Sequence, residues 1–316
     1  MKETVAPNAR PSLDAICESL HTEMAKKPGV ALWLAVDGGF QDLPDTLSAL
    51  QDKAVPDRFS VTLLHPDIPR HWQPTWYALH LERPSDSDLL RASVELALAE
   101  LQSDTLRAGD GRRIAGWLQI AGSVGEVAAR IGRAMVQMHP DGHGSLLRWH
   151  DPAVLWALWP LLDSTQQATW LGSVQCWYLL DPLGCLAALH ADKDSNTDVV
   201  SEVGVHAFSA HQWTNIGHIK AFNHGLRQYL SQPEVGRPDL AQLHQVCMAA
   251  LRRARALNFH DPGDLAVFAE HALCVHPYFD IHPLVQAVLK ERDTDAYYSG
   301  VVAQLSVTDW QVVHAS

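Results

Sequence analysis

Histidines offer the clearest potential for chemistry in this chain, because 18 of its 316 residues are histidines. Imidazole binds zinc and exchanges protons near neutral pH, so a metal-dependent hydrolase that uses the C-terminal histidines is one hypothesis. Two groups are close in sequence: His139, His143 and His150, and His271, His276 and His282. Their spacing is not that of a familiar metal site, since the sequence contains no H-E-x-x-H, no H-x-H and no C-x-x-C.

The patterns for nucleophilic catalysis are also incomplete. No G-x-S-x-G occurs, and the run from Gly142 to Ser145 lacks the closing glycine of a nucleophile elbow. Asp37 and Asp42 flank the end of an expected strand, where the sites of α/β proteins form, but a capping role in the loop also explains Asp37. We therefore expect neither metal-dependent nor nucleophilic hydrolysis and no bound metal ion.

The most informative segment covers residues 146–177 and predicts a strand that runs into a helix. Asp151 stands where a helix N-cap belongs, and Pro152 takes the first helical position, where a missing N–H costs nothing. A second helix start follows at Asp163, with Gln166 three residues later as in a capping box. Arg148 precedes Asp151 by three residues, so its guanidinium is expected either to clamp this corner or to contact a partner.

This segment resembles the signature of the type VI secretion effector adaptors, the Tap/Tec chaperone family. The matching residues are Arg148, Trp149, Asp151, Pro152, Val154, Leu155, Leu162, Asp163, Gln166, Gly172, Val174 and Trp177. His150 stands where the family has tyrosine or phenylalanine, and Ser173 where it has proline. Further matches run through the C-terminal part, among them Gln212-Trp213, Phe259, and Phe279-Asp280 followed by His282-Pro283.

The resemblance implies a cytoplasmic, non-enzymatic adaptor without a cofactor. Members of the family bind a cognate toxic effector and help to mount it on the VgrG spike of the secretion machine. The residues that the resemblance singles out for partner binding or for the motif are Arg148, Trp149, Asp151, Pro152, Gln166 and Trp177. A toxin-binding immunity-type protein is a further alternative, because it would also form a tight complex with a toxin.

The pattern of residues predicts two lobes that would position this segment. In the first, short runs at residues 31–36, 59–64, 76–81, 114–120 and 145–149 read as strands, and residues 86–101 and 124–138 have helical periodicity. We expect residues 1–191 to form an α/β lobe, a mixed sheet with covering helices. Residues 192–198 are polar and read as a linker, and residues 199–316 have the pattern of an all-α lobe.

Composition limits the choice of partners and location. The formal net charge is −12, which argues against nucleic acid as a partner because phosphate binding needs a basic face. The longest apolar runs are too short to span a bilayer, and no signal peptide is evident, so we expect no membrane association. Five dispersed cysteines are typical of reduced thiols in a cytoplasm.

Overall fold

The computed structural model describes two compact units. It describes residues 11–27, 30–37, 39, 43, 45–48, 50, 59–108, 111–190, 208–232 and 238–316. The first unit comprises Met1–Gln102 and Asp110–Ala210, and the second comprises Ser103–Gly109 and His211–Ser316. The predicted linker at residues 192–198 lies outside the described residues.

The first unit is built on a six-stranded sheet with the order β2-β3-β1-β4-β7-β8. Its strands are β1 (Leu32–Val36), β2 (Ser60–Thr62), β3 (Thr75–Leu79), β4 (Ile114–Ile120), β7 (Val174–Leu180) and β8 (Leu186–Leu189). Each neighbouring pair is antiparallel. Strands β3 and β4 are parallel to each other, but β1 lies between them, so the connection through helix α3 forms a split strand–helix–strand unit.

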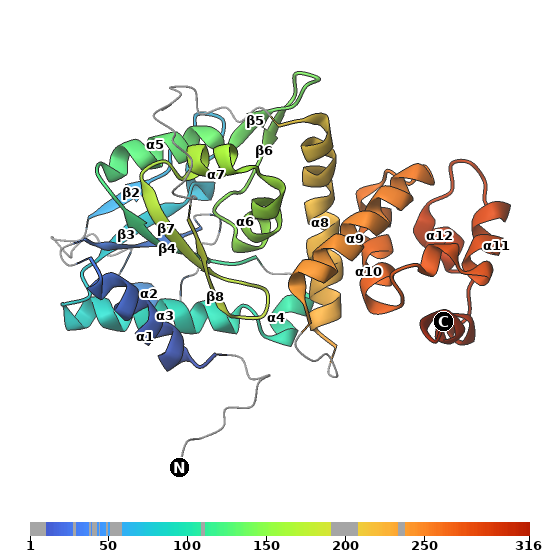
Figure 1. Ribbon diagram of the computed structural model, residues 1–316, viewed down its shortest axis with the longest axis horizontal. Coiled ribbons are helices and arrows are strands. Elements are labelled where there is room, and N and C mark those ends of the chain that lie inside the picture. Colours follow the sequence, from blue (N-terminus) through green and yellow to red (C-terminus); the bar gives the residue numbers. More distant parts are fainter. Residues whose placement is uncertain are drawn as a thin grey trace, which may run out of the picture. The chain divides into compact units, whose positions relative to one another are not determined.

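Helices cover both faces of this sheet (Figure 1). Helices α1 (Leu13–Ala25) and α3 (Pro84–Ala99) pack together on one face. On the other face lie α5 (Val124–Ala134), α6 (Pro152–Leu158) and α7 (Ser164–Leu171). Short elements complete the unit: α2 (Asp45–Ser48), η1 (Arg70–Trp72) and η2 (Trp159–Leu161). With helices on both faces, β1 and β4 are buried along their whole length.

A ladder of aromatic rings fills the core between the sheet and α6–α7. Trp149 stacks on Trp170 with ring centroids 5.1 Å apart, and Trp170 lies 5.1 Å from Trp177. Trp76 meets Trp177 edge-on at 6.1 Å. The backbone of β4 gives room for this ladder at Gly116, where a Cβ atom would lie 2.7 Å from the indole nitrogen of Trp177 and 2.3 Å from the carbonyl oxygen of Tyr178. All four tryptophans are fully buried, as expected for large side chains that dominate core energetics.

A second, two-stranded sheet corrects the predicted helix at residues 124–138. Helix α5 ends at Ala134, and β5 (Val136–Met138) pairs with β6 (Gly144–Leu146). Met135 is buried, as the helical period predicts. Met138, the next apolar residue of that period, is exposed because it lies in β5 and not in a helix. The predicted strand at residues 145–149 is also shorter than expected, because the backbone N–H of Trp149 bonds to the carbonyl of Leu147 and that of Asp151 to the carbonyl of Arg148, so that the chain turns toward α6.

The second unit is helical throughout its described residues. It contains α4 (Ser103–Ala108), α8 (Ala210–Leu230), α9 (Leu240–Ala256), α10 (Pro262–Cys274), η3 (Phe279–Ile281), α11 (Pro283–Glu291), α12 (Tyr298–Val302) and α13 (Val307–His314). Its core centres on Phe268, Phe279 and Tyr298, whose rings pack within 6.3 Å of one another. The predicted fold class, an α/β lobe followed by an all-α lobe, is confirmed. None of the described helices has the length and apolar character that a membrane span needs.

Candidate functional site

The corner between β6 and α6 has the local geometry that its sequence predicts. The Asp151 side chain accepts a hydrogen bond from the backbone N–H of Ala153 at 2.9 Å and so caps α6. Pro152 occupies the first helical position and is buried. This start fixes the direction in which the preceding residues, Arg148 and His150, leave the turn.

The main partner of Arg148 is Asp37 and not Asp151. The Arg148 guanidinium donates a hydrogen bond through Nη2 to Oδ2 of Asp37, a residue at the end of β1. Its Nη1 lies 3.9 Å from Oδ2 of Asp151, beyond hydrogen-bonding distance. The expected clamp within the turn is therefore an ion pair between the turn and the end of the central strand.

Asp37 is a buried carboxylate held in its charged form. Its side chain is 2% exposed, and Oδ1 accepts a hydrogen bond from the backbone N–H of Gly39 at 2.9 Å, which agrees with the predicted loop cap. The Nε2 atom of His150 lies 3.4 Å from Oδ2. Burial raises the pKa of Asp37, but His150, Arg148 and the Gly39 N–H outweigh it and the pKa is lowered.

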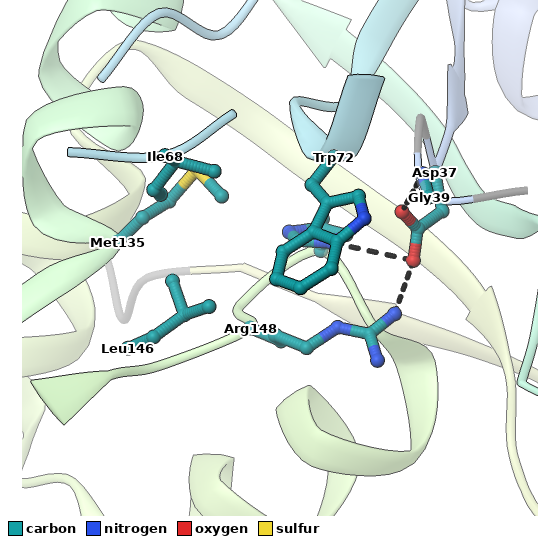
Figure 2. Close-up of a pocket in the computed structure, with 8 residues that line it drawn as sticks. Asp37, Gly39, Ile68, Trp72, Met135, Leu146 and Arg148 are labelled. Atoms are coloured by element: carbon teal, nitrogen blue, oxygen red, sulfur yellow. Dashed lines mark hydrogen bonds and ion pairs between the residues drawn. The ribbon is translucent and has the colours of Figure 1, made fainter. Parts of the chain in front are cut away.

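A pocket opens beside this ion pair and has a volume of about 310 Å³. The lining consists of Asp37, Gly39, Ile68, Trp72, Met135, Leu146, Arg148 and His150. Figure 2 shows Ile68, Met135 and Leu146 at one end and Asp37 with Arg148 at the other, with Trp72 between them. Such a combination of apolar walls and a few polar groups is typical of binding pockets.

Two side chains on the pocket rim leave large apolar areas in contact with solvent. Trp72 is 52% exposed and Leu146 is 44% exposed. Ile68 and Met135, which form the deeper wall, are buried. Exposed aromatic and aliphatic groups around a concavity are frequent anchors of protein interfaces.

The pocket also contains hydrogen-bonding capacity that the described residues do not use. Arg148 donates one hydrogen bond to Asp37 through Nη2, and its Nε and Nη1 groups donate to none of the described residues. The His150 side chain is 2% exposed; its Nε2 lies 3.4 Å from Oδ2 of Asp37, and its Nδ1 has no hydrogen-bond partner in the described part of the chain. Buried polar atoms are rarely left in this state, so the Arg148 donors and the Nδ1 atom of His150 are available for hydrogen bonds with a polar ligand.

The remaining predicted site residues have structural positions. Trp149 and Trp177 lie in the aromatic ladder, and the indole N–H of Trp149 donates to the carbonyl of Ala134 at 2.8 Å. Gln166 completes the predicted capping box of α7: its Oε1 accepts from the Asp163 N–H at 3.0 Å. Of the predicted site residues only Arg148 lines the pocket. Asp151 and Pro152 form the start of α6, and Trp149, Gln166 and Trp177 stabilise the scaffold.

The motif glycine, Gly172, also has a structural role. It ends α7 with φ of +52°, and a Cβ atom there would lie 2.6 Å from the Arg130 guanidinium. Arg130 donates to the carbonyl oxygens of Thr169 and Leu171 and so neutralises the last turn of the helix. A side chain at position 172 would displace this cap.

The histidines of the hydrolase hypothesis occupy separate local sites. His271 contacts the hydroxyl of Tyr298 at 2.6 Å through Nδ1. His276 and His282 accept hydrogen bonds from the backbone N–H groups of Tyr278 and Leu284, at 3.2 and 3.3 Å. Among the described residues, no group of three or more His, Cys, Asp or Glu side chains is placed to hold a metal ion.

Several pocket residues are not among the residues that the sequence singles out for partner binding. Asp37 carries a signal, because an aspartate directly after a buried strand lies at a position where sites form. Ile68, Trp72 and Met135 carry none, since each lies in a segment that has no motif.

Comparisons with family models, with curated proteins and with solved structures find no match to this chain.

Proposed function

We propose that the protein is a non-enzymatic, cytoplasmic adaptor that binds a toxic type VI effector and helps to load it onto the VgrG spike. The observation that carries the proposal is the position of the motif that resembles the adaptor signature. Its Arg148 and His150 line a surface pocket, while its tryptophans form the core that supports the pocket. The resemblance suggests the identity of the partners, and the pocket supports the proposal because it offers a surface for one of them.

The chemistry of the pocket favours binding over catalysis. Both carboxylate oxygens of Asp37 are engaged, Oδ1 by Gly39 and Oδ2 by Arg148, so this group is poorly suited to act as a base. The described lining contains no serine, threonine, cysteine or lysine that would serve as a nucleophile. Apolar walls with hydrogen-bond donors at one end match the features of a protein-binding site.

The test is reconstitution with both proposed partners. The purified chain is mixed with the effector and with the VgrG protein of the same secretion system, and complexes are separated by size-exclusion chromatography. We expect a complex of all three proteins. An immunity-type protein would instead bind the effector, abolish its toxic activity and leave VgrG unbound, and this result would contradict the adaptor proposal.

A further inference from the structure

We propose that the pocket beside Arg148 receives one apolar side chain of the partner, and that Arg148 donates a hydrogen bond to the main-chain carbonyl oxygen next to it. The inference rests on the proposed function, because the partner is taken to be the effector. It specifies what the pocket recognises: an apolar residue in an uncharged stretch of main chain. The pocket has an apolar part and a polar part.

The apolar part follows from the size of the pocket and its walls. A volume of about 310 Å³ lies at the lower end of the range of about 300–1,000 Å³ for ligand pockets, which is enough for one large aliphatic or aromatic side chain. Ile68 and Met135 provide a buried wall, and Trp72 with Leu146 provides an exposed rim. A side chain that enters the pocket covers this rim and removes apolar surface from water on both molecules.

The polar part follows from the single-point contact of Arg148. Its Nη2 group is occupied by Asp37, while its Nε and Nη1 groups donate to none of the described residues. The side chain is 40% exposed, so these donors are accessible to a ligand. His150 adds a second polar group to the lining: it is buried, its Nε2 lies 3.4 Å from Asp37, and its Nδ1 has no hydrogen-bond partner among the described residues.

The local charge decides which oxygen fits these donors. Asp37 already contacts the guanidinium, and the Asp151 carboxylate lies 3.9 Å from its Nη1 group. A ligand carboxylate would be the third negative group around one positive charge, and like charges at this distance repel. A main-chain carbonyl accepts the same hydrogen bond without a net charge, so the arrangement favours an amide oxygen over a carboxylate.

Small probes separate these features without any effector. The probes are N-acetyl-leucinamide, its acid N-acetyl-leucine, and N-acetylglycinamide, which lacks the apolar side chain. Binding is followed in ¹H–¹⁵N spectra through the Nε–H signal of Arg148 and the indole N–H signal of Trp72. The variants Arg148→Lys and Trp72→Phe assign the two signals.

We expect N-acetyl-leucinamide to shift both signals in a saturable manner with a Kd of about 1 mM, as suits a ligand of this size. N-acetyl-leucine should bind at least about threefold more weakly, and N-acetylglycinamide should leave the Trp72 signal unchanged. Arg148→Lys should weaken N-acetyl-leucinamide by about fivefold, because lysine lacks the planar fork of donors. Tighter binding of the acid than of the amide, or no shift of either signal, would overturn the inference.

The outcome is distinguishable from failure of the adaptor proposal. Saturable binding of N-acetyl-leucinamide supports the pocket inference even where the complex with effector and VgrG does not form. Conversely, an effector that binds wild type and Trp72→Ala equally well overturns the inference and leaves the adaptor proposal standing. Tyr297→Ala is the matched control for this comparison, because it removes an exposed aromatic side chain from the second unit.

Discussion

Each of the two units contains a buried aspartate paired with an arginine, and the two pairs differ in how completely the arginine is used. In the second unit, Arg253 donates to both carboxylate oxygens of Asp280, at 2.8 and 2.7 Å, and to the carbonyl of Pro277 at 2.7 Å. Its guanidinium also lies 5.2 Å from the centre of the Tyr278 ring. In the first unit, Arg148 donates one hydrogen bond to Asp37 and faces an open pocket.

The difference shows how one pair of residue types serves two purposes. A two-point contact with further acceptors fixes an arginine and consumes its donors, which is the arrangement of a structural cross-link. A one-point contact holds the arginine in place and leaves donors for a ligand. Arg253 therefore stabilises the fold, whereas the free donors of Arg148 support the proposal that it binds a partner.

The largest expected effect is the loss of the structural pair. Arg253→Met should lower the free energy of unfolding by about 3–5 kcal/mol, because Asp280 would keep a buried charge without its partner. Urea denaturation of the full chain measures this change. A variant that unfolds at the same urea concentration as wild type would remove the distinction between the two arginines.

Acid should affect the two units at different pH. Burial, with a smaller contribution from neighbouring arginines, lowers the pKa of His218 in the second unit from 6.5 to about 4. The unfolded chain therefore takes up this proton first as the pH falls, and stability is lost between pH 6.5 and about 4. The shift corresponds to about 3 kcal/mol. Asp37 in the first unit has a pKa below the ordinary value of 3.8, so its contribution to the free energy of unfolding is lost only as the pH falls below 3.8.

Urea denaturation at pH 7 and at pH 4.5 tests this difference. The free energy of unfolding of the wild-type chain should fall over this interval, and that of His218→Leu should fall by a smaller amount. Leucine suits the position because His218 is fully buried and its ring nitrogens have no hydrogen-bond partner among the described residues. An equal pH dependence in both proteins would show that His218 is not the acid-sensitive group.

At Arg148, stability and binding should respond separately. Arg148→Lys keeps a positive charge beside Asp37, and the side chain is exposed enough for solvent to screen the pair, so the unfolding free energy should fall by less than about 1 kcal/mol. The affinity for the effector should fall at least about tenfold, or about 1.4 kcal/mol. Calorimetric titration and urea denaturation of the same sample provide both values. Loss of stability without loss of affinity would make Arg148 a structural residue like Arg253.

The smallest expected effect concerns the helix cap. Asp151→Ala should cost about 1 kcal/mol of stability, typical for the removal of an N-cap. Affinity should change little, because Asp151 does not line the pocket. Asp163→Ala is a matched control, since it removes the N-cap of α7 away from the pocket. If Asp151→Ala lowers affinity as strongly as Arg148→Lys, Asp151 contacts the partner directly.

The parts of this site that depend on neighbouring residues could be predicted from the sequence. The caps at Asp151 and Asp163 involve residues at most three positions apart, and their residue types are diagnostic. The strand β4 could be predicted to the residue, because its apolar run lies between an arginine pair and a turn. The all-α character of the second unit follows from helical periodicity alone.

The parts that depend on distant contacts could not. Asp37 and Arg148 are 111 positions apart in the sequence, and no spacing rule connects them. The pocket combines the end of β1, the segment around η1, the end of α5 and the turn after β6, so it exists only once the sheet order is set. The strand β5 could not be predicted for the same reason. Tertiary packing buries Met135, and a helix that continued past Ala134 would bury it too, so the sequence pattern does not distinguish the two structures.

The most direct test of the account is the affinity of the effector for pocket variants of the full chain. Trp72→Ala and Leu146→Ser remove the exposed apolar rim, and Tyr297→Ala with Val307→Ala removes exposed apolar groups in the second unit. Calorimetric titration against the effector should show at least about tenfold weaker binding for the two rim variants and less than about twofold for the controls. Equal affinities for all four variants would contradict the claim that this pocket binds the partner.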